Sequence, residues 1–275
     1  MILALLCFAA LDTTTKLATV APVVMALWLR YLVQTVGTFT ACWPSLRTTL
    51  FQTRRPRQQA LRVVLAIACG VIGYLGLRHM PVGEYTAIST LTPMLLTVAA
   101  AWRLGERVAS QTWICIAAGF AGTLAMVRPG PAVFRIEALI PVLLAIATTA
   151  YQLLTRDLAK TDKPTTIHFY SGAGGLLVTS LLLPLVWEPL SSGTWALLLL
   201  AACFGSTGHF MVVVAFAGAP VASLAPYLYL QILFATLAGW VIFGHIPDTW
   251  SLIGMGAIAA AGIASTRLAL RNSSQ

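Results

Sequence analysis

The sequence predicts an all-α polytopic membrane protein. Of its 275 residues, 59% are hydrophobic and only 9% are charged, and the mean hydropathy is +0.86. Soluble domains carry roughly 25% charged residues, so this chain lacks the polar surface that a water-soluble globule needs. Apolar runs of about 20 residues, the length that crosses a bilayer as a helix, follow one another with short connections. No soluble domain fits between them.

Ten segments are long and apolar enough to be transmembrane helices. The longest connection between two of them starts at Pro44 and is strongly basic. The predicted spans cover residues 2–18, 23–43, 62–79, 86–104, 112–128, 138–158, 166–187, 195–216, 222–243 and 250–270.

The distribution of Lys and Arg predicts that both termini are cytoplasmic. A net charge of +9 is compatible with nucleic-acid binding, but the basic residues fall mostly between apolar runs. There they act as topology determinants and contacts to anionic lipid, so we expect the lipid bilayer as a partner and no nucleic acid. With the N-terminus inside, the outer side holds Lys16, Arg78, Arg128 and Arg135, and Arg30 lies within a span. The inner side holds the larger set, Arg47, Arg54, Arg55, Arg57, Arg62, Arg103, Arg107, Arg156, Lys160, Lys163, Arg267 and Arg271.

Short internal similarities predict two five-helix repeats, over residues 1–131 and 132–275. "ACGVIGY" from Ala68 resembles "ACFGSTGH" from Ala202, and "MPVGEYTA" from Met80 resembles "APVASLAP" from Ala219. The matches keep the same order along the chain. Because five is odd, the second repeat enters the membrane from the opposite side, which makes the repeats inverted. Inverted repeats favour alternating access, since each half can adopt the conformation of the other.

Three motifs within this pattern resemble those of a known family. They are "RY" at Arg30–Tyr31, "P-V-x-x-x-x-A" from Pro81 and "GE" at Gly105–Glu106. With ten spans in two halves, they resemble the EamA-type transporters of the drug/metabolite transporter superfamily over essentially the whole chain. The resemblance implies a carrier in the bacterial inner membrane with a central cavity, moving a small solute such as an amino acid, vitamin or nucleoside-like compound. The second half departs from this pattern, with His245 after Gly244.

Asp12 and Lys16 place two charges in the first predicted span. One helical turn separates them, so they can pair on one face. Ionisable residues at membrane depth usually face a bundle interior or a water-filled cavity. We therefore predict that Asp12 contacts the solute or carries a coupling proton, with Lys16 beside it. The alternative is that Lys16 extends to the outer interface and Asp12 only pairs with it.

Three further residues, in spans 2, 3 and 8, are candidates for contact with the solute. Arg30 could attract an anionic group at the outer mouth, or anchor the helix at the interface beside Trp28 and Tyr31. Tyr74 and His209 follow similar glycine-containing segments in the two repeats, where they either face the solute or pack. The glycines, such as Gly205 and Gly208, allow close helix packing.

Polar residues near prolines inside spans predict further solute contacts. Prolines free backbone carbonyls that a cavity or neighbour must satisfy, and Pro93 and Pro226 lie in spans 4 and 9. Gln152 is a lone amide in span 6, suited to a cavity or to a bond between helices. Aromatic and amide groups near helix breaks suit a planar solute. The residues near the breaks are Thr90, Thr92, Tyr227 and Gln231.

The leading functional prediction is a secondary active transporter, with proton coupling left open. The sequence shows no H-E-x-x-H, G-x-S-x-G or Walker A motif, so we expect no catalytic residue, metal or cofactor. A membrane-embedded enzyme and a scaffold or channel subunit are the alternatives, and a homodimer is an open arrangement. Two other residues are interpreted as follows: Glu106 is either a gate or a local salt-bridge cap between Arg103 and Arg107, and His168 is a structural residue near the inner interface.

Overall fold

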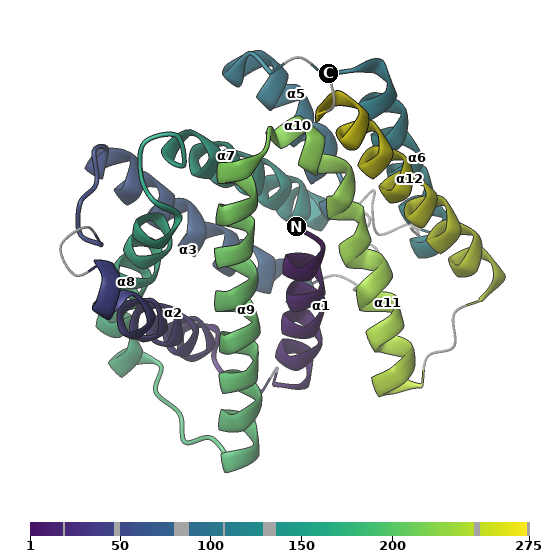
Figure 1. The fold of residues 1–275 in the computed structure, drawn as a ribbon. Coiled ribbons are helices and arrows are strands. Elements are labelled where there is room, and N and C mark those ends of the chain that lie inside the picture. The colour runs from purple at the N-terminus through teal and green to yellow at the C-terminus, as the bar shows by residue number, and fades with distance from the viewer. Residues whose placement is uncertain are drawn as a thin grey trace. The chain divides into compact units, whose positions relative to one another are not determined.

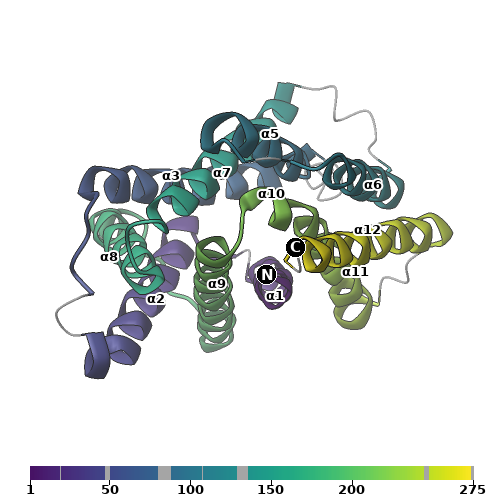
Figure 2. The same ribbon diagram turned by 45° about the horizontal axis from the view of Figure 1, so that its top comes forward.

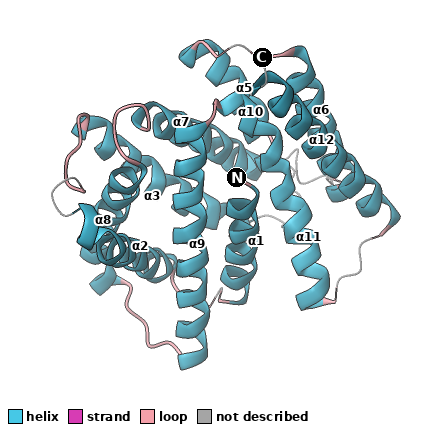
Figure 3. Ribbon diagram, in the orientation of Figure 1, coloured by secondary structure: helices cyan, strands magenta, loops and turns pink. Residues whose placement is uncertain are grey.

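The computed structural model describes residues 1–18, 20–46, 50–79, 88–106, 108–128, 136–244 and 248–273. Within these ranges every regular element is helical (Figure 3), and every predicted span overlaps a helix. The motif at Pro81 and residue His245 lie outside the described residues. The all-helical class is therefore confirmed.

The helices follow the predicted spans closely in chain order (Figure 1). The first five long helices are α1 (Ile2–Leu17), α2 (Val23–Leu46), α3 (Pro56–His79), α5 (Thr92–Leu104) and α6 (Ser110–Val127). The remaining elements are η2 (Ile136–Ala138), α7 (Leu139–Leu158), α8 (Pro164–Leu182), η3 (Leu183–Leu185), α9 (Ser192–Gly218), α10 (Val221–Leu224), η4 (Ala225–Tyr229), α11 (Leu230–Phe243) and α12 (Thr249–Ser273).

Six helical segments of the described chain are long and apolar enough to cross a membrane. This number supports a polytopic protein by length and composition. The segments are Val23–Ala41, Pro56–Gly76, Ile136–Leu158, Pro164–Leu185, Ser192–Gly218 and Val221–Ile242.

The helices form two compact units, and each unit combines helices from both halves of the sequence. Unit 1 contains residues 1, 3–70 and 154–218, and thus α1, α2, α8, α9 and the first part of α3. Unit 2 contains residues 2, 71–153 and 219–275, and thus α5, α6, most of α7, α11 and α12. The predicted boundary between the sequence repeats, near residue 131, therefore does not coincide with the division into compact units.

Glycines bring the helices of unit 1 into close contact. A Cβ atom added to Gly175 of α8 would lie 2.6 Å from the Tyr31 ring, and one on Gly172 would lie 2.9 Å from Cγ of Gln34. α8 and α2 pack side by side in consequence (Figure 1). On α9, a Cβ on Gly208 would lie 2.8 Å from the Phe8 ring. The close packing predicted at Gly208 is thus confirmed.

Unit 2 has its closest helix contact between α6 and α12, which run side by side in both views (Figures 1 and 2). A Cβ on Gly122 of α6 would lie 2.9 Å from the carbonyl oxygen of Gly254 on α12. The two backbones therefore cross where neither residue has a side chain. Arg128, just after α6, forms an ion pair with Asp248, just before α12.

The ninth predicted span is broken, as Pro226 predicted. It consists of α10, the 3-10 segment η4 and α11, and Pro226 lies in the first turn of η4. α5 likewise has a proline, Pro93, in its first turn, after a turn at residues 90–91. Both α5 and α11 end at a glycine with left-handed backbone: Gly105 has φ 65° and Gly244 has φ 69°. Glycine adopts this conformation without the steric cost that other residues have.

Candidate functional site

Polar side chains from five helices, most of them buried, meet inside unit 1. We call this set the polar core of unit 1; it lies among helices that are otherwise apolar. Buried polar groups are costly unless they are hydrogen-bonded, so such a concentration in membrane-spanning helices marks a place where polarity is needed. The members are Gln34 of α2, Arg62 of α3, Thr155 of α7, His168 and Ser171 of α8, and Ser206 of α9.

His168 links three helices in this core. Only 3% of its surface is exposed. The amide nitrogen of Gln34 donates to the His168 carbonyl oxygen at 2.8 Å and lies 3.4 Å from its Nδ1. Its Nε2 lies 3.3 Å from Oγ of Ser206. These contacts hold His168 between α2, α8 and α9, which agrees with the structural role predicted for it.

Arg62 is a buried cation in the same core, with 1% of its surface exposed. Its Nε donates to Oγ1 of Thr155 at 2.8 Å, and one Nη donates to the Ile167 carbonyl at 3.1 Å and to the Ser171 hydroxyl. The sequence predicts that Arg62 lies at the inner side as a topology determinant. The structure adds that α3 begins at Pro56 and that Arg62 is directed toward α7 and α8.

Asp162 connects the segment between α7 and α8 to the start of α3 and to the residues just before it. Its carboxylate accepts hydrogen bonds from the Thr53 hydroxyl, from the Arg54 backbone N–H at 3.2 Å and from the Gln59 amide at 3.0 Å. Burial raises the pKa of this carboxyl, but the hydrogen bonds, including one from Thr161, outweigh burial and hold the pKa below its usual value. Asp162 therefore stays charged at neutral pH.

Arg30 of α2 lies one turn before Gln34 and is half-buried. Its Nε is buried and makes no hydrogen bond within the described part of the chain. The guanidinium lies 6.0 Å from the centre of the Tyr31 ring. A Cβ on Gly205 of α9 would lie 3.3 Å from this Nε. The missing side chain of Gly205 thus makes room for Arg30.

Three other predicted residues lie in unit 1. Asp12 and Lys16 are exposed on α1. His209 of α9 is half-buried, and its ring meets the Phe8 ring edge-on at a centroid distance of 4.8 Å. Gly205 is beside Ser206, and Leu11 lies 3.4 Å from the position of a Gly205 Cβ. Arg30 and the polar core of unit 1 therefore meet consecutive residues of α9, Gly205 and Ser206.

The other predicted residues lie in unit 2, near the helix breaks or within helices. Thr92 donates to the Ser89 carbonyl at 2.8 Å, at the start of α5. Gln152 of α7 has a buried Oε1 without a hydrogen bond among the described residues. Tyr227 is buried in η4. Half-buried positions are held by Tyr74, Thr90 and Gln231.

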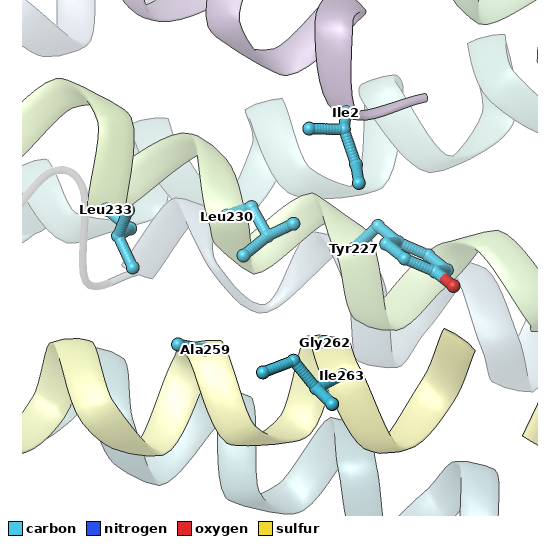
Figure 4. Close-up of a pocket in the computed structure, with 7 residues that line it drawn as sticks. All are labelled: Ile2, Tyr227, Leu230, Leu233, Ala259, Gly262 and Ile263. Carbon is cyan, nitrogen blue, oxygen red and sulfur yellow. The ribbon is translucent and has the colours of Figure 1, made fainter. Parts of the chain in front are cut away.

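A small apolar pocket borders Tyr227. Figure 4 shows Tyr227, Leu230 and Leu233 of η4 and α11 opposite residues of α12. The pocket volume is about 220 Å³. This is below the 300–1,000 Å³ typical of ligand sites, so the pocket suits one ring system and not a whole metabolite. Its remaining lining residues are Ile2, Ala259, Gly262 and Ile263.

Glu106 caps α10 within unit 2. Its two carboxylate oxygens accept the backbone N–H groups of Val221, at 3.1 Å, and Ala222, at 3.0 Å. A carboxylate at a helix N-terminus satisfies donors that have no partner inside the helix. Sequence reasoning predicted a cap at Glu106 but placed its partners in the neighbouring arginines. The structure shows that it also connects the end of α5 to the start of α10.

Sequence reasoning did not select Gln34 and Ser206 as site residues. Gln34 lies four residues after Arg30, so the helical period puts both on one face of α2. Ser206 lies inside "GSTG", a segment whose glycines were interpreted as positions of close helix packing. A polar residue one turn from a charge in an apolar span was therefore the observation that could have found Gln34.

Comparisons with known proteins identify the class of protein to which this chain belongs. A model of the EamA-like transporter family matches residues 1–128. A riboflavin transporter of Rhizobium johnstonii is 31% identical, over 80% of this chain and 73% of the relative. An S-adenosylmethionine uptake transporter of Rickettsia prowazekii is 27% identical, over 74% of this chain and 69% of the relative.

A solved structure described as "Crystal structure of protein" shares the fold. It has a TM-score of 0.82 at 16% identity and covers 96% of this chain and 95% of its own. The protein is therefore a multi-pass inner-membrane transporter for small metabolites. It belongs to the EamA-like transporter family.

Proposed function

We propose that this transporter moves a metabolite with a planar heteroaromatic ring joined to a polar chain, by alternating access. Riboflavin and S-adenosylmethionine, named for the two relatives, both have this construction. The apolar pocket beside Tyr227 suits the ring, and polar residues near the helix breaks suit the chain. The relatives are transporters, which favours this function over a membrane-embedded enzyme.

The architecture we propose has ten spans in two inverted five-helix repeats, residues 1–131 and 132–275, with both termini cytoplasmic. The observation that carries it is the likeness of α5 and α11. α5 has a proline in its first turn and α11 follows a 3-10 segment that contains a proline, and both end at a left-handed glycine, Gly105 or Gly244. Discontinuous helices at matching positions of two repeats are typical of secondary transporters and point to the solute site.

Residues of both units are proposed as solute contacts, each within its own unit. In unit 1 Asp12 is the candidate for a solute amine or a coupling proton, with Lys16 as its neighbour. The other proposed contacts of unit 1 are Arg30 and His209. In unit 2 the proposed contacts are Tyr74, Thr90, Thr92, Gln152, Tyr227 and Gln231.

Comparative metabolite profiling tests the proposed function. The wild type and Asp12→Asn are expressed in one bacterial host, and metabolites are followed over time in cells and medium. We expect one heteroaromatic compound to accumulate on one side only with the wild type, because Asp12→Asn removes a charge from the proposed path. Equal membrane levels of both proteins provide the control. The same accumulation with Asp12→Asn at every pH would remove Asp12 from the mechanism.

A further inference from the structure

Arg30 is a cation inside a membrane-spanning segment, and its Nε donor has no hydrogen-bond acceptor among the described residues. It lies in the span Val23–Ala41, about 10 Å of helix rise beyond Val23. A charge at such depth is costly, and these residues usually serve a solute or ion path. Its Nε is buried and has no hydrogen-bond partner in the described part of the chain. A buried donor without a partner needs an explanation, and a ligand is one.

Arg30 lies against α9 at Gly205, and polar residues follow nearby along α2 and α9. Gly205 faces the Arg30 Nε at 3.3 Å from its would-be Cβ. Ser206, the next residue, contributes a hydroxyl that also meets His168. Gln34, one turn after Arg30, holds His168 in place through the bond to its carbonyl. Arg30 therefore supplies a fixed positive charge one helical turn from Gln34 and against Gly205, the residue before Ser206.

We propose that Arg30 binds a carboxylate or phosphate group of the transported solute, at the junction of α2 and α9 in unit 1. A guanidinium presents its N–H groups in a planar fork that matches the oxygens of both anions. Gln34, one turn after Arg30 on α2, and Ser206, next to Gly205 on α9, are the polar residues that follow on the two helices. This inference rests on the proposed function, because that function makes the ligand of Arg30 a transported solute. It selects anionic members of the proposed substrate class over neutral ones.

Transport of matched solute pairs into proteoliposomes tests the proposal. The pairs are S-adenosylmethionine against decarboxylated S-adenosylmethionine, and flavin mononucleotide against riboflavin. We expect the wild type to prefer the carboxylate- or phosphate-bearing member of at least one pair by roughly tenfold or more. Arg30→Gln should bring the ratio of transport rates, anionic over neutral member, close to one, and Arg30→Lys should retain part of the preference. Arg57→Gln, at an exposed position, should leave the ratio unchanged. A wild type without preference, or an Arg30→Gln protein that slows both members equally, would overturn the inference.

A second measurement does not depend on transport. Purified protein in detergent is treated with phenylglyoxal, which modifies guanidinium groups, and the modified arginines are quantified by mass spectrometry. Flavin mononucleotide or inorganic phosphate should slow modification of Arg30 several-fold and leave exposed Arg57 unaffected. If Arg30 is never modified, or is protected only by phosphatidylglycerol, the proposal fails, because a solute cannot reach it or a lipid headgroup is its partner. Protection of Arg30 without transport of any of the four solutes would instead reject the proposed substrate class and keep the anion site.

Discussion

Arg62 shows at the scale of one residue how unit 1 accommodates a buried cation. Its hydrogen bonds to Thr155, the Ile167 carbonyl and Ser171 tie α3 to α7 and α8. We expect Arg62→Ala to lower the free energy of unfolding by about 2–4 kcal/mol, because buried polar groups lose their partner. Chemical denaturation in detergent micelles measures this. Arg57→Ala, at an exposed site, should stay within about 0.5 kcal/mol of the wild type; a similar result for Arg62→Ala would contradict this role.

Asp162 predicts a pH dependence of stability. Its folded pKa lies below the unfolded value of 3.8. The carboxylate therefore stabilises the folded protein fully above that value, and this contribution is lost as the pH falls through the folded pKa. Thermal unfolding between pH 7 and pH 2.5 should show a steeper acid loss for the wild type than for Asp162→Asn. Glu188→Gln, at an exposed carboxyl, is the control, and identical acid profiles for wild type and Asp162→Asn would refute the role of Asp162.

At the scale of elements, the contact of α6 with α12 depends on two glycines. Gly254→Ala should lower the free energy of unfolding by about 1–3 kcal/mol, because the new Cβ meets the Gly122 carbonyl and Met126. Gly256→Ala lies on the same helix and has nothing within 4 Å of its Cβ, so it is a matched control. Denaturation of the two variants side by side separates packing from helix propensity. Equal stabilities would show that the helices separate without cost.

The cap formed by Glu106 on α10 gives a second prediction for elements. Glu106→Ala removes the acceptor of the Val221 and Ala222 N–H groups, so the start of α10 should open more often. Hydrogen exchange followed by mass spectrometry should show faster exchange in the peptide that contains these two residues. Glu188→Ala should leave that peptide unchanged. Exchange as slow in Glu106→Ala as in the wild type would mean that other contacts hold α10.

The positions of the helices could be predicted well from the sequence, and the polar core could not. Apolar runs of bilayer length determine where each helix lies, and Pro226 determines where the ninth span breaks. The polar core of unit 1 brings together Gln34, Arg62 and His168, which are distant in the chain. Their meeting depends on how α2, α3 and α8 pack, and hydropathy does not contain that information.

At the scale of the whole molecule, two divisions of the chain coexist. Sequence similarity predicts repeats on either side of residue 131, whereas the compact units each combine segments from both sides. α5 and α11, the matching helices of the proposed repeats, lie together in unit 2. The helices that match in the proposed repeats therefore pack within one unit.

Solute flux in a purified system tests the central claim, transport of a heteroaromatic metabolite, most directly. The protein is reconstituted into liposomes, and movement of labelled riboflavin and labelled S-adenosylmethionine is followed over time against empty liposomes. We predict saturable movement of at least one of the two, with excess unlabelled solute on the opposite side accelerating exchange, as expected of a carrier. Movement of neither solute above the level of empty liposomes, with the protein correctly inserted, would contradict the claim.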